Sequence, residues 1–109
     1  MDSKINTNEH VPVVANKNVN NNISIEKSDM VYTPGKNNLS GNIILRHDDN
    51  ITEDVLIEFM VISTKDNRCV FNDVQKLQFN NGVNKLENMI IHPDSNTDDS
   101  LKIKINDLK

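Results

Sequence analysis

The residues best suited to chemistry form a short acidic run, residues 94–99, with the sequence DSNTDD. Oxygen-bearing side chains at its first, third and fifth places match the first ligands of an EF-hand calcium loop, which also needs Gly at the sixth place and Glu at the twelfth. Here those places hold Asp99 and Ile105. The sequence therefore predicts a solvated acidic loop, with weak calcium binding as the alternative, and the acidic residues 48–49 and 53–54 lead to the same prediction.

The other reactive side chains are one cysteine and three histidines. Cys69 lies in the short run RCVF, without an Arg or Lys cluster at a helix start, so we expect a small buried or half-buried apolar residue and not a reactive thiol. His10, His47 and His92 are far apart and lack the spacing of metal ligands. No nucleophile elbow or oxyanion-hole motif accompanies any of them. We therefore expect no catalytic, cofactor-binding or metal-binding residues, and no enzyme.

Length and charge restrict the partners. A chain of 109 residues forms one domain and can bury a core without disulfides. The formal net charge is −4, and such an acidic domain disfavours nucleic acid and anionic membrane surfaces. No apolar run approaches the roughly 20 residues of a membrane span, and the first residues lack the apolar stretch of a signal peptide. The expectation is a cytoplasmic protein without membrane insertion.

The first 22 residues differ from the remainder. Residues 1–22 are rich in Asn, and their apolar residues are scattered without a sustained period. Such a segment buries too little apolar surface to offset the entropy of ordering it. The sequence predicts a disordered Asn-rich tail over residues 1–22, although the short run VPVV at 11–14 could also be a docking peptide or an added edge strand.

Residues 23–109 have the pattern of one β-sandwich domain. Period-two alternation or short apolar runs predict about seven strands, at residues 23–25, 39–45, 55–62, 70–71, 74–79, 86–91 and 101–105. The run 55–62 is apolar on both faces, which predicts a central strand covered on both faces. Residues 48–50 and 65–67 fit hairpin turns, and Asn80-Asn81-Gly82 is the strongest turn signal. The fold class is all-β, of immunoglobulin-like type.

A family resemblance covers residues 23–109, and the stretch from residue 23 to residue 45 carries most of it. Its motifs are ISIE at 23–26, YTPG at 32–35, the small pair SG at 40–41 and GNIIL at 41–45, followed by VLIEF at 55–59. They resemble the opening strands of an arrestin-type β-sandwich domain. Tyr32, Pro34 and Gly35 form the corner, where Pro34 fixes φ and Gly35 accepts a positive φ. Gly41 inside a strand predicts a bulge or a close backbone approach.

The resemblance implies a non-catalytic adaptor that binds a protein partner, with trafficking or signalling as the expected setting. Sandwiches of this kind commonly bind an extended segment at an open sheet edge, and the strands around Ile25 and Ile103 are the candidate edges. The alternative is a structural or surface immunoglobulin-like module of an extracellular, phage or viral assembly. A lectin is less favoured, because Trp is absent and Tyr32 is the only tyrosine. The sequence predicts neither the oligomeric state nor a second sandwich domain on another chain.

Overall fold

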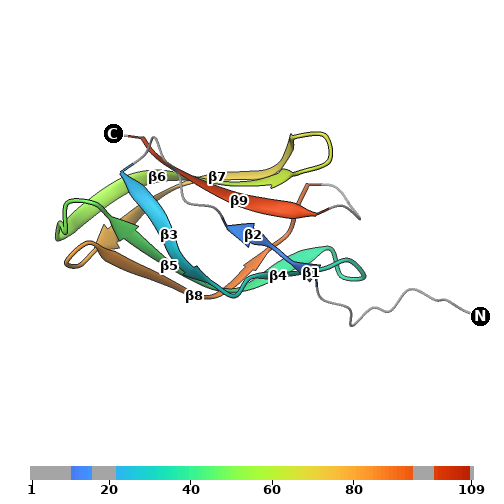
Figure 1. Cartoon of the computed structure of the whole chain (residues 1–109), viewed down its shortest axis with the longest axis horizontal. Coiled ribbons are helices and arrows are strands. Elements are labelled where there is room, and N and C mark those ends of the chain that lie inside the picture. The colour runs from blue at the N-terminus through green and yellow to red at the C-terminus, as the bar shows by residue number, and fades with distance from the viewer. Residues whose placement is uncertain (1–10, 16–21, 95–99, 109) are drawn as a thin grey trace, which may run out of the picture.

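The computed structural model describes residues 11–15, 22–94 and 100–108, and all the regular structure there is β-strand (Figure 1). The strands are β1 (Val11–Pro12), β2 (Val14–Ala15), β3 (Ile23–Ser28), β4 (Val31–Thr33), β5 (Asn38–His47), β6 (Glu53–Ser63), β7 (Arg68–Phe79), β8 (Val83–Ile91) and β9 (Leu101–Asp107). The predicted all-β fold class is therefore confirmed, with nine described strands in place of about seven.

The strands form two sheets that enclose one core. In the first, here sheet A, the order is β1-β4-β5-β3, and β8 lies along the other side of β5. In the second, sheet B, the order is β2-β9-β6-β7. The long strands β5 and β6 are the central strands of the two sheets, because each pairs on both sides. This arrangement is consistent with a β-sandwich.

Period-two alternation in the sequence explains which side chains form the core. On β6 the predicted core residues Ile57 and Phe59 are buried, and Phe59 is only 1% exposed. The Phe59 ring meets the edge of Phe71 with the ring centroids 6.4 Å apart. Burying one such side chain contributes about 1.5–3 kcal/mol. The opposing face of the core comes from β5 of sheet A, with Leu39, Ile43 and Leu45. Beside β6 in sheet B, β9 adds Leu101, Ile103 and Ile105 to the same core.

The second face of β6 differs from the prediction. Leu56 is 44% exposed, while Glu58, Met60 and Ile62 are half-buried. Among the described residues no second layer covers this face, because a sandwich of two sheets buries only the inner side of each. The expectation of a strand covered on both faces was wrong, and its outer apolar residues lie on the surface of sheet B.

Part of the predicted tail belongs to the sheets. Val11 in β1 lies opposite Tyr32 of β4, and Val14 in β2 lies parallel to β9, opposite Lys102. Between them Val13 is 8% exposed in the core. The prediction of a tail without structure is therefore wrong for residues 11–15, and the alternative of an added edge strand is correct there. Residues 1–10 and 16–21 of the predicted tail lie outside the described residues.

The tight turn at residues 80–82 has the predicted geometry. Asn80 and Val83 exchange two main-chain hydrogen bonds of 2.9 and 3.0 Å. Between them Asn81 has a φ of 52° and Gly82 a φ of 79°. Positive φ at both central positions is typical of a type I′ turn, for which Asn-Gly is the preferred pair. After this turn the chain passes from β7 in sheet B to β8 in sheet A.

Two other predicted connections have different outcomes. The hairpin at residues 65–67 is confirmed, because it joins the paired strands β6 and β7. Residues 48–50 do not form a hairpin: they join β5 in sheet A to β6 in sheet B. The predicted strands 70–71 and 74–79 form a single strand, β7, in which an irregularity of register lies between Cys69 and Phe71. The polar residues Asn72 and Asp73 are therefore part of a strand and not a break.

Candidate functional site

The predicted corner is a structural element. Tyr32 is buried and its hydroxyl donates a hydrogen bond of 2.6 Å to Asn37 Oδ1. The positive φ of this turn is at Asn37, with a φ of 50°, and not at Gly35, so the expectation for Gly35 was wrong. Asn is one of the few residues besides Gly that adopt this conformation, which explains the exchange of roles. Pro34 lies within the same turn, and its carbonyl accepts a hydrogen bond from the Asn37 N–H.

Gly41 has the predicted close backbone approach. Its φ is 143°, and a Cβ there would lie 2.7 Å from Asp29 Oδ1 and 2.9 Å from both the Asp29 carbonyl oxygen and Met30 Cα. Directly after Gly41, the pairing of β5 with β8 shifts register. Both alternatives of the prediction, a bulge and a close approach, are therefore present at this glycine.

A hydrogen-bonded cluster follows on the outer face of sheet A. Asn42 donates from its main-chain N–H to Asp29 Oδ1 at 2.5 Å and from Nδ2 to Asp29 Oδ2 at 3.0 Å. Its own Oδ1 accepts a hydrogen bond of 2.9 Å from the Asn88 N–H. The hydrogen bonds from Asn42 lower the pKa of the Asp29 carboxyl. Through these bonds the cluster holds the bulges of β5 and β8 together.

His47 is buried and has partners on both ring nitrogens. Its Nδ1 accepts a hydrogen bond of 3.1 Å from the Asp49 N–H, and its Nε2 lies 3.8 Å from Asp107 Oδ2. The ring meets Phe79 edge-on, with the centroids 5.9 Å apart. These contacts connect β5 of sheet A with β7 and β9 of sheet B. His47 is therefore part of the packing between the two sheets.

The remaining predicted chemistry-bearing residues lie apart. Cys69 is exposed and its thiol donates to the Phe71 carbonyl at 3.2 Å, so the prediction of burial was wrong. It lies beside the register shift of β7, where alternation no longer predicts the face. His92 is exposed, whereas His10 and residues 95–99 lie outside the described residues. Within the described chain, no group of three or more His, Cys, Asp or Glu residues could hold a metal ion.

A hollow of about 500 Å³ lies where β7 and β8 diverge after their turn. Its lining consists of Gln78, Asn80, Val83, Asn84 and Lys85. Asn84 donates from Nδ2 to the Gln78 carbonyl oxygen at 2.8 Å, which connects the two sheets, and its buried Oδ1 has no hydrogen-bond partner among the described residues. This hollow lies at the end of β7 and the start of β8.

The main chain of β7 is open on the side away from β6. The Gln78 carbonyl bonds to Asn84 of β8, so it points away from β6. Because alternate residues of a strand direct their N–H and C=O groups to the same side, the main-chain groups of Asn72, Val74 and Lys76 also point away from β6. In the described part of the chain, no strand pairs with β7 on this side.

Both ends of this edge are closed. The Val70 carbonyl accepts a hydrogen bond of 2.7 Å from the Asp94 N–H, and the Gln78 carbonyl accepts the one from Asn84. The open stretch of β7 is therefore residues 72–76. Sequence reasoning missed it, and the candidate edge at Ile103 was wrong, because β9 pairs there with both β6 and β2. The candidate at Ile25 lies on β3, which pairs with β5 on one side.

Exposed apolar side chains accompany the open stretch on the outer face of sheet B. Val74 is 50% exposed, and Leu56 on the neighbouring strand is 44% exposed. Glu58, the cross-strand neighbour of Val74, accepts hydrogen bonds from Asn72 Nδ2 at 2.5 Å and from Asn106 Nδ2 at 3.1 Å. The first of these bonds is the largest cause of a lowered pKa at Glu58.

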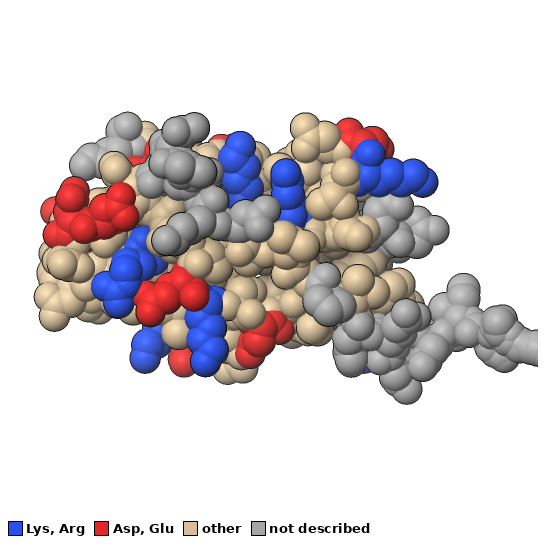
Figure 2. Space-filling view, in the orientation of Figure 1, with Lys and Arg blue, Asp and Glu red and all other residues tan. Residues whose placement is uncertain are grey.

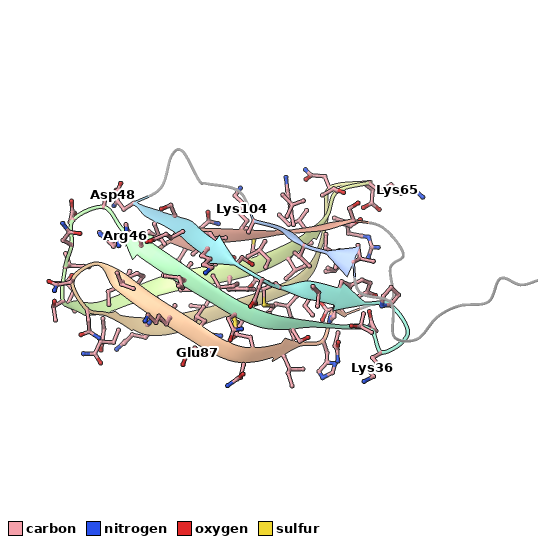
Figure 3. The ribbon with its side chains drawn as sticks, turned by 60° about the horizontal axis from the view of Figure 1, so that its bottom comes forward. Lys36, Arg46, Asp48, Lys65, Glu87 and Lys104 are labelled. Carbon is pink, nitrogen blue, oxygen red and sulfur yellow. The ribbon has the colours of Figure 1, made fainter. Side chains whose placement is uncertain are left out.

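The edge of β8 is protected in ways that the edge of β7 is not. The register shift between β5 and β8 leaves Glu87 and Asn88 unpaired as a bulge, and Asn88 has a φ of 55°. Glu87 is exposed and projects from β8 into solvent (Figure 3). A bulge of this kind interrupts the regular main chain that an added strand would need, and residues 72–76 of β7 contain none. The open stretch of β7 is therefore the better candidate for an interaction site.

Charge does not gather at one place on the visible face. Figure 2 shows Lys and Arg side chains interspersed with Asp and Glu, without one continuous basic patch. Among the described residues no helix is long and apolar enough to span a membrane.

Comparison with known proteins adds no relative, since no family model, no curated protein and no solved structure matches this chain.

Proposed function

We propose that this chain is a non-catalytic protein-interaction module of the arrestin-like adaptor type, which binds an extended segment of a protein partner by strand addition along β7. The observation that carries the proposal is the open stretch of β7 at residues 72–76. Its main-chain donors and acceptors at Asn72, Val74 and Lys76 point away from β6. On either side of them, the carbonyl groups of Val70 and Gln78 already accept hydrogen bonds from this chain.

An added strand would bind through two kinds of contact. Each main-chain hydrogen bond contributes a net of about 0.5–1.5 kcal/mol, because the free edge is already bonded to water. The half-exposed Val74 and Leu56 offer apolar surface beside the edge. Strand addition obtains affinity from the first kind of contact and specificity from side chains at alternate positions. The edge therefore suits an extended peptide that presents apolar residues toward sheet B.

The location proposed for this module is the cytoplasm. Cys69 is exposed and is the only cysteine of the chain. An exposed thiol without a second cysteine to form a disulfide stays reduced in a cytosolic environment, whereas structural disulfides are typical of secreted domains of this size. This observation supports the adaptor over an exported immunoglobulin-like module.

Selection of binding peptides tests the proposal directly. Random peptides displayed on phage would be selected on the immobilised full chain. The site where each selected peptide binds would then be mapped from changes in the amide chemical shifts of this chain. Val74→Pro removes one outward N–H and leaves the hydrogen bonds to β6 intact, which an edge strand tolerates. We expect it to abolish peptide binding, whereas Val74→Thr, which keeps the N–H and a β-branched shape, should retain it.

Shift changes confined to residues outside β7, or equal binding by the Pro and Thr variants, would contradict strand addition at this edge. Far-UV circular dichroism and the melting temperature of the Pro variant provide the control for folding. Both should remain close to those of the wild-type chain.

A further inference from the structure

We infer that the segment that occupies the open stretch of β7 is β7 of a second copy of this chain, paired antiparallel about a two-fold axis at Val74. This inference rests on the proposed strand addition and names its partner. The product would be a symmetric dimer in which sheet B continues from one copy into the other.

The open stretch is symmetric about Val74. It is closed by hydrogen bonds at Val70 and at Gln78, which lie at equal distances along the chain on either side of Val74. A two-fold axis at Val74 places Asn72 opposite Lys76 of the second copy and Val74 opposite itself. Every outward main-chain group of the open stretch would then find a partner, and none of the groups already bonded to Asp94 or Asn84 would be needed.

The side chains also complement one another in this register. Lys76 meets the neutral Asn72 of the second copy, and Asp73 meets Gln75. Within one chain Gln75 already donates from Nε2 to Asp73 Oδ2 at 2.7 Å, and the same donor and acceptor would meet between the copies. No two like charges are directly opposite, which matters because such pairs destabilise a sheet.

Neighbouring registers are worse. An axis at Asp73 or at Lys76 would place two like charges directly opposite. An axis one residue after Val74 would place Asp73 opposite the buried Leu77. An axis two residues before Val74 would pair the second copy with Val70, whose carbonyl is already bonded. An axis between two residues, rather than at one, would pair side chains from opposite faces of the sheet. Such registers are excluded, because directly opposed residues share a face.

The same axis joins exposed apolar surface. Val74, 50% exposed, would lie against Val74 of the second copy, and each Leu56, diagonal to Val74 on β6, would add apolar surface to the same outer face of the continuous sheet. Both patches are half-exposed in the single chain. A two-fold axis makes one surface complementary to itself, and such dimers are the commonest oligomers.

Sedimentation velocity of the full chain is the first test. We expect a reversible dimer whose fraction rises with concentration. Val74→Pro should weaken association at least about tenfold, because it removes the central pair of main-chain hydrogen bonds. Val74→Thr should associate as the wild type does. A chain that remains monomeric up to about 1 mM, the weak end of specific association, would overturn the inference, as would a dimer that Val74→Pro does not weaken.

Cross-linking tests the register. In a Cys69→Ser background, Val74→Cys would place two thiols on directly opposed, hydrogen-bonded residues, with their Cα atoms about 5.5 Å apart, within the range of a disulfide. Oxidation should therefore give a covalent dimer at low protein concentration. Leu56→Cys on the same face is the matched control, because each Leu56 lies one strand farther from the axis and should cross-link weakly.

Equal cross-linking at the two positions would overturn the proposed axis. The outcomes also separate the two proposals. Peptides that bind along residues 72–76 of a monomeric chain would refute the second copy and leave strand addition standing. A dimer that cross-links at Val74 supports both, and the selected peptides should then dissociate it.

Discussion

Substituting Gly41 by Ala should strongly destabilise the domain, although it adds only one methyl group. The new Cβ would lie 2.7 Å from Asp29 Oδ1 and 2.9 Å from the Asp29 carbonyl oxygen and Met30 Cα. Two of these three atoms belong to the main chain, so a side-chain rotation cannot relieve the contact. The φ of 143° is in addition a conformation that L-residues rarely adopt.

The size of the effect follows from these two causes. Backbone strain in such a region costs about 1–3 kcal/mol, and an extra methyl group in a closely packed place costs about 1–3 kcal/mol. Together they give about 4 kcal/mol, a large part of the 5–15 kcal/mol that stabilises a typical domain. At about 4 °C per kcal/mol for a chain of this size, the melting temperature should fall by about 16 °C.

Urea unfolding followed by circular dichroism measures this difference, with Gly35→Ala as the control. Gly35 is exposed and is not among the residues of positive φ. Its substitution should change the free energy of unfolding by less than about 1 kcal/mol and can raise it, because Ala restricts the unfolded chain. A loss at Gly41 below about 1 kcal/mol, or an equal loss at both glycines, would refute this account of the close approach.

Three further predictions concern β6 and β7. Phe59→Ala should cost about 3–5 kcal/mol in urea unfolding and Leu56→Ala less than about 1 kcal/mol, because only Phe59 is buried; equal losses would contradict the assigned faces. The hydrogen bond from Asn72 lowers the pKa of Glu58 from 4.5, so Glu58 stabilises the fold above that pH and loses this effect as the pH falls through the folded-state pKa. As the pH is lowered below 4.5, the urea midpoint should therefore fall less for Glu58→Gln than for the wild type. An equal fall of the midpoint with pH in both proteins would exclude this role. Cys69 should react with a thiol reagent in the native state nearly as fast as in urea, and slow labelling would place it in the core.

Alternation in the sequence predicted which residues face the core, because burial on one side of a strand leaves a period of two. It placed Ile57 and Phe59 in the core, as the structure confirms. A glycine inside a strand, at Gly41, predicted the bulge or close approach, and both are present. The Asn81-Gly82 pair predicted its turn equally well, since positive φ at both positions is a local property.

The neighbours of each strand could not be predicted in this way. The polar residues 48–50 would suit a hairpin, yet they connect two sheets, because local turn chemistry does not specify where the next strand goes. Strands β1 and β2 have two residues each, too few for a period to be visible. The bounds of the open stretch of β7 depend on hydrogen bonds from Asp94 to Val70 and from Asn84 to Gln78, which have no sequence signal. The charges of Asp73 and Lys76 are nevertheless typical of an edge strand.

The passage of the chain between the sheets at residues 48–50 and 80–82 has a kinetic consequence. Only the hairpins β4–β5 and β6–β7 pair strands that are adjacent in the described sequence, whereas β5 must find β8 and β6 must find β9 across long intervening segments. Contacts between such distant residues slow folding to the range of about milliseconds to seconds. A β6–β7 hairpin that closes early would wait for β9 with its apolar surface uncovered. In newly made chains at high concentration, the edge that pairs two folded copies would then also be the place where association competes with folding.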